Sequence, residues 1–210
     1  MWKRYEVELQ MTGYFAASLP KTKEEIEQML EHRMPAKPPE DFIPLDELAN
    51  EVAEKVGATE EEEEEVKYGW ATFCRNEDGL YYEGRCVRGH LKDCANQVKD
   101  VIKPEIKSLK AKVANKVYVM TDVIPLGAKE IAGTVQRFVQ VITRKGPRST
   151  IKYVDYLEKP ILKFRLNVLD DGIITDDILN TIFEYGSVHG MGQERSQGWG
   201  RYTFTIRKLV

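Results

Sequence analysis

The sequence is poor in the residues that cross-link a protein, hold a metal or anchor it in a membrane. Its 210 residues include only three cysteines and three histidines. The cysteines form no C-x-x-C pair and leave an odd thiol, which is not the pattern of a disulfide framework or a zinc site. No apolar run approaches the roughly 18 residues that a membrane span needs, and none follows the opening MWKRYEVE. We therefore expect a reduced, cytoplasmic protein with no membrane segment, metal or cofactor.

An excess of positive charge is also missing. The formal net charge is −3 at pH 7, and a run of glutamates, Glu60–Glu65, concentrates much of the acid in one place. A negative net charge is not typical of a protein that binds nucleic acid over its whole surface. Because the glutamate run dominates the sum, however, the basic residues have to be located one by one.

Alternating apolar and polar residues indicate strands near both ends of the chain. Residues 5–11, 160–169 and 201–209 alternate with the period of half-buried strands. Two further runs, 115–120 and 134–143, are rich in β-branched and aromatic residues, which favour strands. The basic stretch TRKGPRSTIK, which follows the second run, is predicted to be a loop.

Two helices are predicted among these strands. The first begins at about Val87 and stops before Pro104, since apolar residues recur there at three- and four-residue spacing. The second spans residues 175–186, with Thr175 as N-cap and Gly186 as C-cap. Strand, helix and returning strand, preceded by a similar half, predict a ferredoxin-like or RNA-recognition-motif-like α+β sandwich.

A helical, acidic insertion is expected after the first strand. Two helical stretches, KTKEEIEQMLEHR and PLDELANEVAEKVG, are separated by a proline-rich segment that breaks the helical period and are followed by the glutamate run. The glutamates themselves are typical of a solvated face or a disordered loop. We therefore predict that residues 1–18 and 68–210 form the core and that residues 19–67 form the insertion.

The stretch GMGQERSQGWGRY, residues 190–202, places four glycines between a helix and the last strand. Glycine removes the Cβ atom where a backbone must run close to something, and it allows backbone angles that other residues avoid. Amide groups in such a loop can form an anion site, and Gln193, Arg195 and Ser196 add donors suited to phosphate oxygens. The loop runs from helix to strand and lacks a G-K-[ST] ending, so it is not a nucleotide-binding P-loop.

Three blocks of the sequence, in order, resemble motifs of the RAMP superfamily, the RNA-recognition-motif-fold proteins of CRISPR effector complexes and CRISPR RNA processing. The block GMGQERSQGWGRY resembles the family's glycine-rich loop. The block LYYEGRCVRGHLKD resembles its "pYIPGSSLKGaLR" segment, and VELQMTGYFAAS resembles its first strand, which ends in "TGLHIGG". The middle block implies a backbone subunit of type III-like complexes, which binds guide RNA together with other subunits of a ribonucleoprotein.

The resemblance implies that two segments line the RNA. The first is a helical face bearing Arg85, Arg88 and Lys92 at three- and four-residue spacing, with Gly84 directly before them and Gly89 between Arg88 and Lys92. The second is the glycine-rich loop. The residues predicted to bind RNA are Arg85, Arg88, Lys92, Gly190, Gly192, Gln193, Arg195, Ser196, Gly198, Gly200 and Arg201.

The sequence departs from the family at its catalytic position. Backbone subunits that cut target RNA carry an aspartate shortly before the middle block, whereas this chain has no acid between Val66 and Asn76. Glu83, Arg85 and Cys86 also replace the family's proline and two serines. We therefore expect binding without cleavage and assign no catalytic residue.

Two alternatives stay open. CRISPR RNA-processing endoribonucleases of the same superfamily share the glycine-rich loop, and many use a histidine as general acid or base, a role that His32 could take. The chain could also be a stand-alone virus- or host-encoded module that binds nucleic acid or protein, since its acidic insertion suits a protein partner or imitates nucleic-acid charge.

Overall fold

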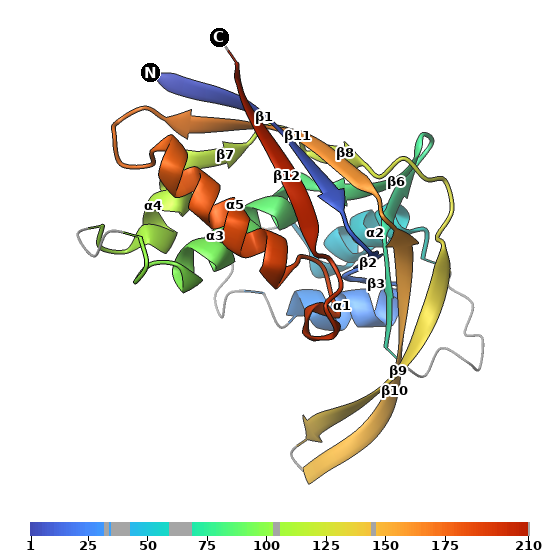
Figure 1. The fold of residues 1–210 in the computed structure, drawn as a ribbon. Helices are drawn as coiled ribbons and strands as arrows, with labels where there is room; N and C mark the ends of the chain where they lie inside the picture. Colours follow the sequence, from blue (N-terminus) through green and yellow to red (C-terminus); the bar gives the residue numbers. More distant parts are fainter. Residues whose placement is uncertain (32–33, 35–42, 59–68, 103–105, 144–145, 210) are drawn as a thin grey trace. The chain divides into compact units, whose positions relative to one another are not determined.

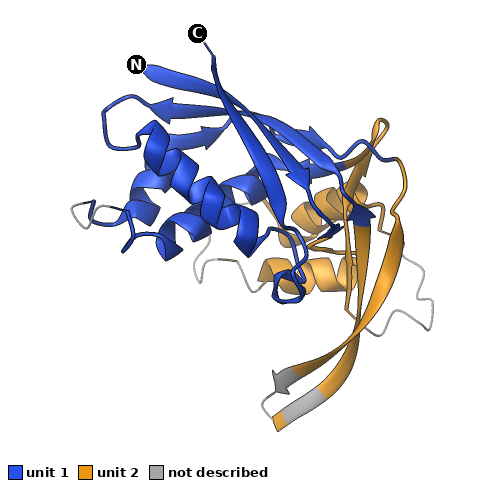
Figure 2. Cartoon of the chain, viewed as in Figure 1, with its two compact units in different colours: residues 1–16, 81–128, 157–210 blue, residues 17–80, 129–156 orange. Residues whose placement is uncertain are grey.

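The chain divides into two compact units. In the computed structural model, the described residues are 1–31, 34, 43–58, 69–102, 106–143 and 146–209. Unit 1 comprises residues 1–16, 81–128 and 157–210, and unit 2 comprises residues 17–80 and 129–156 (Figure 2). Both units are therefore assembled from segments that are distant in the sequence.

Unit 1 has the βαββαβ order of a ferredoxin-like sandwich. Its main elements are β1 (Trp2–Met11), α3 (Gly84–Gln97), α4 (Leu109–Lys116), β7 (Val117–Val119), β11 (Ile161–Leu169), α5 (Asp176–His189) and β12 (Tyr202–Leu209). The strands form one antiparallel sheet in the order β12-β1-β11-β7. Helices α3, α4 and α5 lie on one face of this sheet (Figure 1). The α+β fold class predicted from the sequence is confirmed.

The alternation of β1 and β11 builds the core of unit 1. Val7 pairs with Phe164 and Leu9 pairs with Leu162 across the two central strands, and all four side chains are buried. Burying each such side chain contributes about 1.5–3 kcal/mol. The helices cover this face because α5 presents its own buried apolar side chains to it, among them Phe183.

The opposite face of the sheet pairs its own charges. Glu6 lies in register between Arg165 on β11 and Arg207 on β12 and forms an ion pair with Arg207. On the next row, Lys163 lies 3.0 Å from Glu8. These ion pairs are exposed and contribute little stability, but they neutralise much of the charge on this face.

Short strands complete unit 1. Strand β2 (Tyr14–Ala16) follows the turn after β1, and residues of β6 (Gly79–Glu83) pair antiparallel with β8 (Val123–Pro125). Gly84 begins α3 directly after β6, and its amide donates to the carbonyl of Asp122 at 2.8 Å. A Cβ at Gly84 would collide with the carbonyl oxygen of Thr121, so the fold itself requires this glycine.

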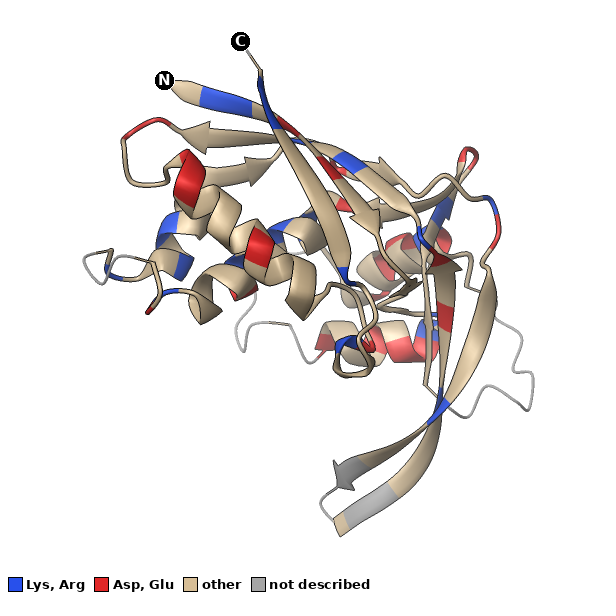
Figure 3. Cartoon of the chain, in the orientation of Figure 1, with Lys and Arg blue, Asp and Glu red and all other residues tan. Residues whose placement is uncertain are grey.

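Unit 2 combines two acidic helices with a long hairpin. Its elements are β3 (Leu19–Pro20), α1 (Lys23–Glu31), α2 (Leu45–Val56), β4 (Trp70–Thr72), β5 (Cys74–Asn76), β9 (Gly133–Thr143) and β10 (Gly146–Glu158). Strands β9 and β10 form the hairpin, and β4 pairs parallel with β10 and antiparallel with β3. Acidic residues cluster on α1 and α2, which occupy the two predicted helical stretches (Figure 3).

The structure corrects several sequence-based boundaries. Helix α3 begins at Gly84 rather than near Val87, and it ends at Gln97. Helix α5 continues past Gly186 to His189, with Gly190 as its C-cap. The stretch TRKGPRSTIK is not simply a loop, because β10 begins at Gly146. Helix α4 has no counterpart among the predicted elements, because its apolar spacing is weak over only eight residues.

The predicted insertion and the observed unit differ in extent. Unit 2 contains residues 19–67, but it also takes in residues 68–80 and the hairpin segment 129–156. Its sheet explains this extent, since β4 and the hairpin come from the part of the chain predicted to be core. Glu60–Glu65 and His32 lie outside the described residues.

Candidate nucleic-acid interface

The glycine-rich loop connects α5 to β12 and contains one short turn, the 3-10 helix η2 (Arg195–Gln197). Its four glycines all adopt left-handed or otherwise positive φ angles, 80° at Gly190, 79° at Gly192, 78° at Gly198 and 72° at Gly200. Only glycine adopts such angles without steric cost. The path of the loop therefore requires glycine at these four positions.

Three of these glycines allow close approach of the protein's own backbone. A Cβ at Gly190 would lie 2.5 Å from the carbonyl oxygen of Trp199, and one at Gly192 would lie 2.5 Å from that of Ala16. At Gly200 it would collide with the carbonyl oxygen of Met191. The three glycines thus allow the loop to pack on itself and on the end of β2.

Gly198 has a different surrounding. The nearest heavy atom to a Cβ there would be Cζ of the Arg201 side chain at 3.5 Å, an ordinary contact. Arg201 and Ser196 are exposed, and Gln193 is half-buried in an isolated bridge with Ala16. Among the described atoms, Oε1 of Gln193 is buried without a hydrogen-bond partner. Residues 195–197 and Arg201 therefore present exposed polar and basic side chains.

Arg195 is held by two neighbours on the helices. Its Nη1 donates to Asp93 Oδ2 at 3.1 Å and to His189 Nε2 at 2.7 Å. Burial raises the pKa of Asp93, but the hydrogen bond from the Arg195 guanidinium helps to outweigh it, so that the pKa is lowered. Arg195 remains 41% exposed and can reach a ligand.

A buried polar cluster lies between α3, α5 and β12. His90 Nε2 lies 2.9 Å from the hydroxyl of Tyr202, and Cys94 Sγ lies 3.6 Å from the same nitrogen. Burial lowers the pKa of His90 to about 4, and the nearby positive charge of Arg195 contributes in the same direction. Burial also raises the pKa values of Cys94, to about 12, and Tyr202. The cluster is therefore uncharged at neutral pH.

Gly186 makes room for this cluster. A Cβ at this position of α5 would collide with the Tyr202 hydroxyl and would lie 2.7 Å from His90 Nε2. The glycine predicted as a helix cap therefore lies inside the last turn of α5 and leaves space for Tyr202 and His90. The sequence does not indicate this role of Gly186, because the residues that occupy the space beside it come from α3 and β12.

The predicted cations of α3 are in different environments. Arg85 bonds to Glu83, with its Nε 2.9 Å from the carboxylate oxygen. Arg88 donates to the carbonyl oxygen of Ala114 at 2.6 Å, and its guanidinium lies 5.0 Å from the centre of the Tyr118 ring. Lys92 is half-buried and has no ion pair recorded within the described part of the chain. Arg88 thus ties α3 to α4 and β7, whereas Arg85 is exposed.

The structure also brings together residues that sequence analysis did not single out. Tyr14, the first residue of β2, packs against Trp199 of the glycine-rich loop with ring centres 4.9 Å apart. In unit 2, the buried carboxylate of Asp155 accepts bonds from Trp70 Nε1 at 2.9 Å and Thr134 Oγ1 at 2.6 Å. Both donors bond to Oδ1, so Asp155 on β10 links β4 and β9 through its side chain.

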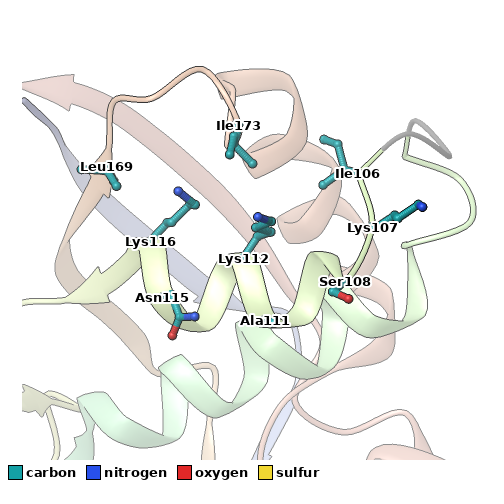
Figure 4. Close-up of a pocket in the computed structure, with 9 residues that line it drawn as sticks. All are labelled: Ile106, Lys107, Ser108, Ala111, Lys112, Asn115, Lys116, Leu169 and Ile173. Atoms are coloured by element: carbon teal, nitrogen blue, oxygen red, sulfur yellow. The ribbon is translucent and has the colours of Figure 1, made fainter.

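An open groove of about 790 Å³ lies beside α4 (Figure 4). Basic side chains of α4 and the preceding segment form one wall, and aliphatic side chains of β11 and the following loop contribute to the other. The lining residues are Ile106, Lys107, Ser108, Ala111, Lys112, Asn115, Lys116, Leu169 and Ile173. Lys116 is paired with Asp171. The groove lies near the start of α5, whereas the glycine-rich loop follows its end.

The residues described by the structure form no group of three or more histidine, cysteine or acidic side chains that could hold a metal ion. Among these same residues, no helix is long and apolar enough to cross a membrane.

Two solved structures are similar to this chain. One is a chain of a type III-B Cmr-beta complex bound to cognate target RNA, with 11% identity and a TM-score of 0.43, covering 99% of this chain and 61% of that one. The other is a chain of a type IV-B CRISPR complex, with 10% identity and a TM-score of 0.45, covering 97% and 90% of the two chains. No protein-family model and no curated protein matches the sequence.

Proposed function

We propose that unit 1 binds single-stranded RNA, as a guide-RNA-binding subunit of a CRISPR-type ribonucleoprotein, and does not cleave it. The motif order in the sequence supports this function, and so does the presence of exposed arginines on a rigid loop. Phosphate groups are the natural ligands of such arginines, because charge-assisted hydrogen bonds are about twice as strong as neutral ones. The proposed RNA partner contacts α3 and the glycine-rich loop.

The observation that carries the proposal is Gly89. It lies inside α3 between Arg85 and Lys92, yet a Cβ there would meet no atom within 4 Å. A glycine inside a helix costs about 1 kcal/mol relative to alanine, and the protein's own packing gives no reason for that cost here. An RNA backbone that runs close to the helix supplies one, since a side chain would hold it away.

Replacing Gly89 should therefore separate stability from binding. We expect Gly89→Ala to stabilise the protein by about 1 kcal/mol and to weaken binding of a labelled single-stranded RNA by about fivefold, the loss of roughly 1 kcal/mol of contact. Thermal melts and fluorescence anisotropy measure the two effects. Gln97→Ala, on an exposed part of the same helix, serves as control and should leave affinity unchanged. If Gly89→Ala binds the RNA as tightly as the natural chain, α3 is not part of the interface.

Arg195 provides a second test at the glycine-rich loop. We expect Arg195→Ala to weaken RNA binding by about 2 kcal/mol, or roughly thirtyfold, because a charge-assisted phosphate contact is lost. The slope of log affinity against log salt should also fall by about 0.7, the value for one phosphate on a single strand.

The matched control is Arg207→Ala, which removes the same charge from the ion pair with Glu6 on the sheet. Equal losses for the two variants would mean that only total charge matters and would contradict a site at the loop. Specific cuts in repeat RNA by the purified protein, abolished by His32→Ala, would instead favour the processing endoribonuclease. If the purified protein binds no RNA at any salt concentration, a stand-alone protein-binding module would be favoured instead.

A further inference from the structure

Backbone hydrogen bonds join the turn after β1 and the start of β2 to the glycine-rich loop. The amide of Gly200 donates to the carbonyl oxygen of Tyr14 at 2.8 Å, and the amide of Thr12 donates to that of Arg201 at 2.9 Å. The Thr12 hydroxyl donates to the same carbonyl at 3.2 Å. Two segments from opposite ends of the sequence therefore hold Tyr14 in one place.

The ring of Tyr14 rests on a second ring. Its centre lies 4.9 Å from that of Trp199, with the planes tilted by 47°, and aromatic pairs at such distances attract each other beyond simple burial. Tyr14 nevertheless remains 43% exposed. Next to it, Gly13 has open space on the side where a Cβ would lie. The loop thus holds a large aromatic side chain in position without covering it.

Two exposed arginines belong to the same loop as Trp199. Arg201 follows Gly200, the residue bonded to Tyr14, and Arg195 lies four residues before Trp199. Single-stranded nucleic acids are bound by this combination, in which cations track the phosphates and aromatic rings stack on the bases. A partner protein would instead be expected to cover an exposed aromatic ring with apolar surface.

We propose that Tyr14, supported by Trp199, stacks on a nucleobase of the bound RNA while Arg201 holds an adjacent phosphate. This inference rests on the proposed function of unit 1 and adds a contact to the bases. Stacking accepts every base because each has a π-face, so the contact strengthens binding without imposing a sequence. The support of Trp199 and the two backbone bonds fixes the ring before RNA arrives, which lowers the entropic cost of binding.

The test compares three proteins on two RNAs. The proteins are the natural chain, Tyr14→Phe and Tyr14→Leu, and the RNAs are a single-stranded oligonucleotide and the same backbone with abasic sites throughout. On the RNA with bases, we expect Tyr14→Leu to bind about tenfold more weakly and Tyr14→Phe to bind within about twofold of the natural chain, since phenylalanine keeps the π-face. On abasic RNA, all three should bind equally.

Fluorescence of 2-aminopurine in the RNA gives a second readout that does not depend on affinity. We expect the natural chain and Tyr14→Phe to quench it and Tyr14→Leu to quench it less. Equal binding and equal quenching by all three proteins would overturn the stacking contact while leaving RNA binding intact. Failure of the natural chain to bind either RNA at low salt would overturn the proposed function itself. Thermal melts of each variant show whether a loss of affinity reflects unfolding.

Discussion

Gly200→Ala is expected to destabilise the protein by about 4 kcal/mol, whereas Gly198→Ala should cost only about 1 kcal/mol. Both glycines have left-handed backbone angles, with φ of 72° and 78°, which cost other residues about 1–2 kcal/mol. The difference arises from space. A Cβ at Gly200 would collide with the backbone of Met191, which also bonds to Gly200, while one at Gly198 faces only the flexible end of Arg201. Overpacking of this kind adds about 1–3 kcal/mol.

Chemical denaturation of both variants measures the difference directly. The two substitutions are matched in residue type, backbone conformation and loop. The cost of the left-handed backbone angle therefore cancels when their unfolding free energies are compared. Equal losses of stability would show that the close approach of residues 191 and 200 is unimportant. Because Gly198 has room beside it, its alanine variant should also fold well enough for RNA affinity to be measured per folded molecule.

A pH dependence centred on His90 is the second large effect. The pKa of His90 is about 4 in the folded protein, against about 6.5 in an unfolded chain. Between these values the unfolded chain binds the proton and the folded protein does not. Stability from this residue is therefore complete above about pH 6.5 and declines as the pH falls towards 4. At 1.36 kcal/mol per pKa unit, the loss is on the order of 3 kcal/mol.

Comparison with His90→Gln isolates this contribution. Glutamine does not titrate, so the difference in unfolding free energy between the two proteins should shrink as the pH falls from 7 to 4. His189→Gln is the matched control, because His189 is partly exposed and lies on the same network. Parallel stability curves for the natural chain and His90→Gln would contradict the burial of a neutral His90. Carboxylates titrate in both proteins and therefore cancel in the comparison.

The strands of the sheet could be predicted from the sequence because the alternation of apolar and polar residues is a property of each strand by itself. Alternation along β1 and β11 requires only that one face be buried, and both strands obey it along their length. The pattern of α5 was equally clear, but its end was placed too early. Gly186 resembles a cap in the sequence, and only the packing of Tyr202 and His90 against it shows that the missing side chain leaves space for them.

The site was harder to predict because its residues depend on distant partners. The sequence grouped Arg88 with Arg85 and Lys92 by spacing alone, yet the carbonyl of Ala114 and the ring of Tyr118 hold Arg88. Tyr14 was not predicted at all, since its support comes from Trp199 near the other end of the chain. Spacing within one helix cannot report either contact.

The order of the strands in the sheet affects how the protein folds during its synthesis on the ribosome. Strand β1 is synthesised first, but its two neighbours in the sheet are β11, which begins at Ile161, and β12, which begins at Tyr202. At about 5–20 residues per second, the first strand waits on the order of 10 s for a partner. During that time β1 has neither of its neighbouring strands, and its apolar side chains, including Val7 and Leu9, lack the sheet in which they are later buried. We expect the nascent chain to need a chaperone until its last fifth emerges.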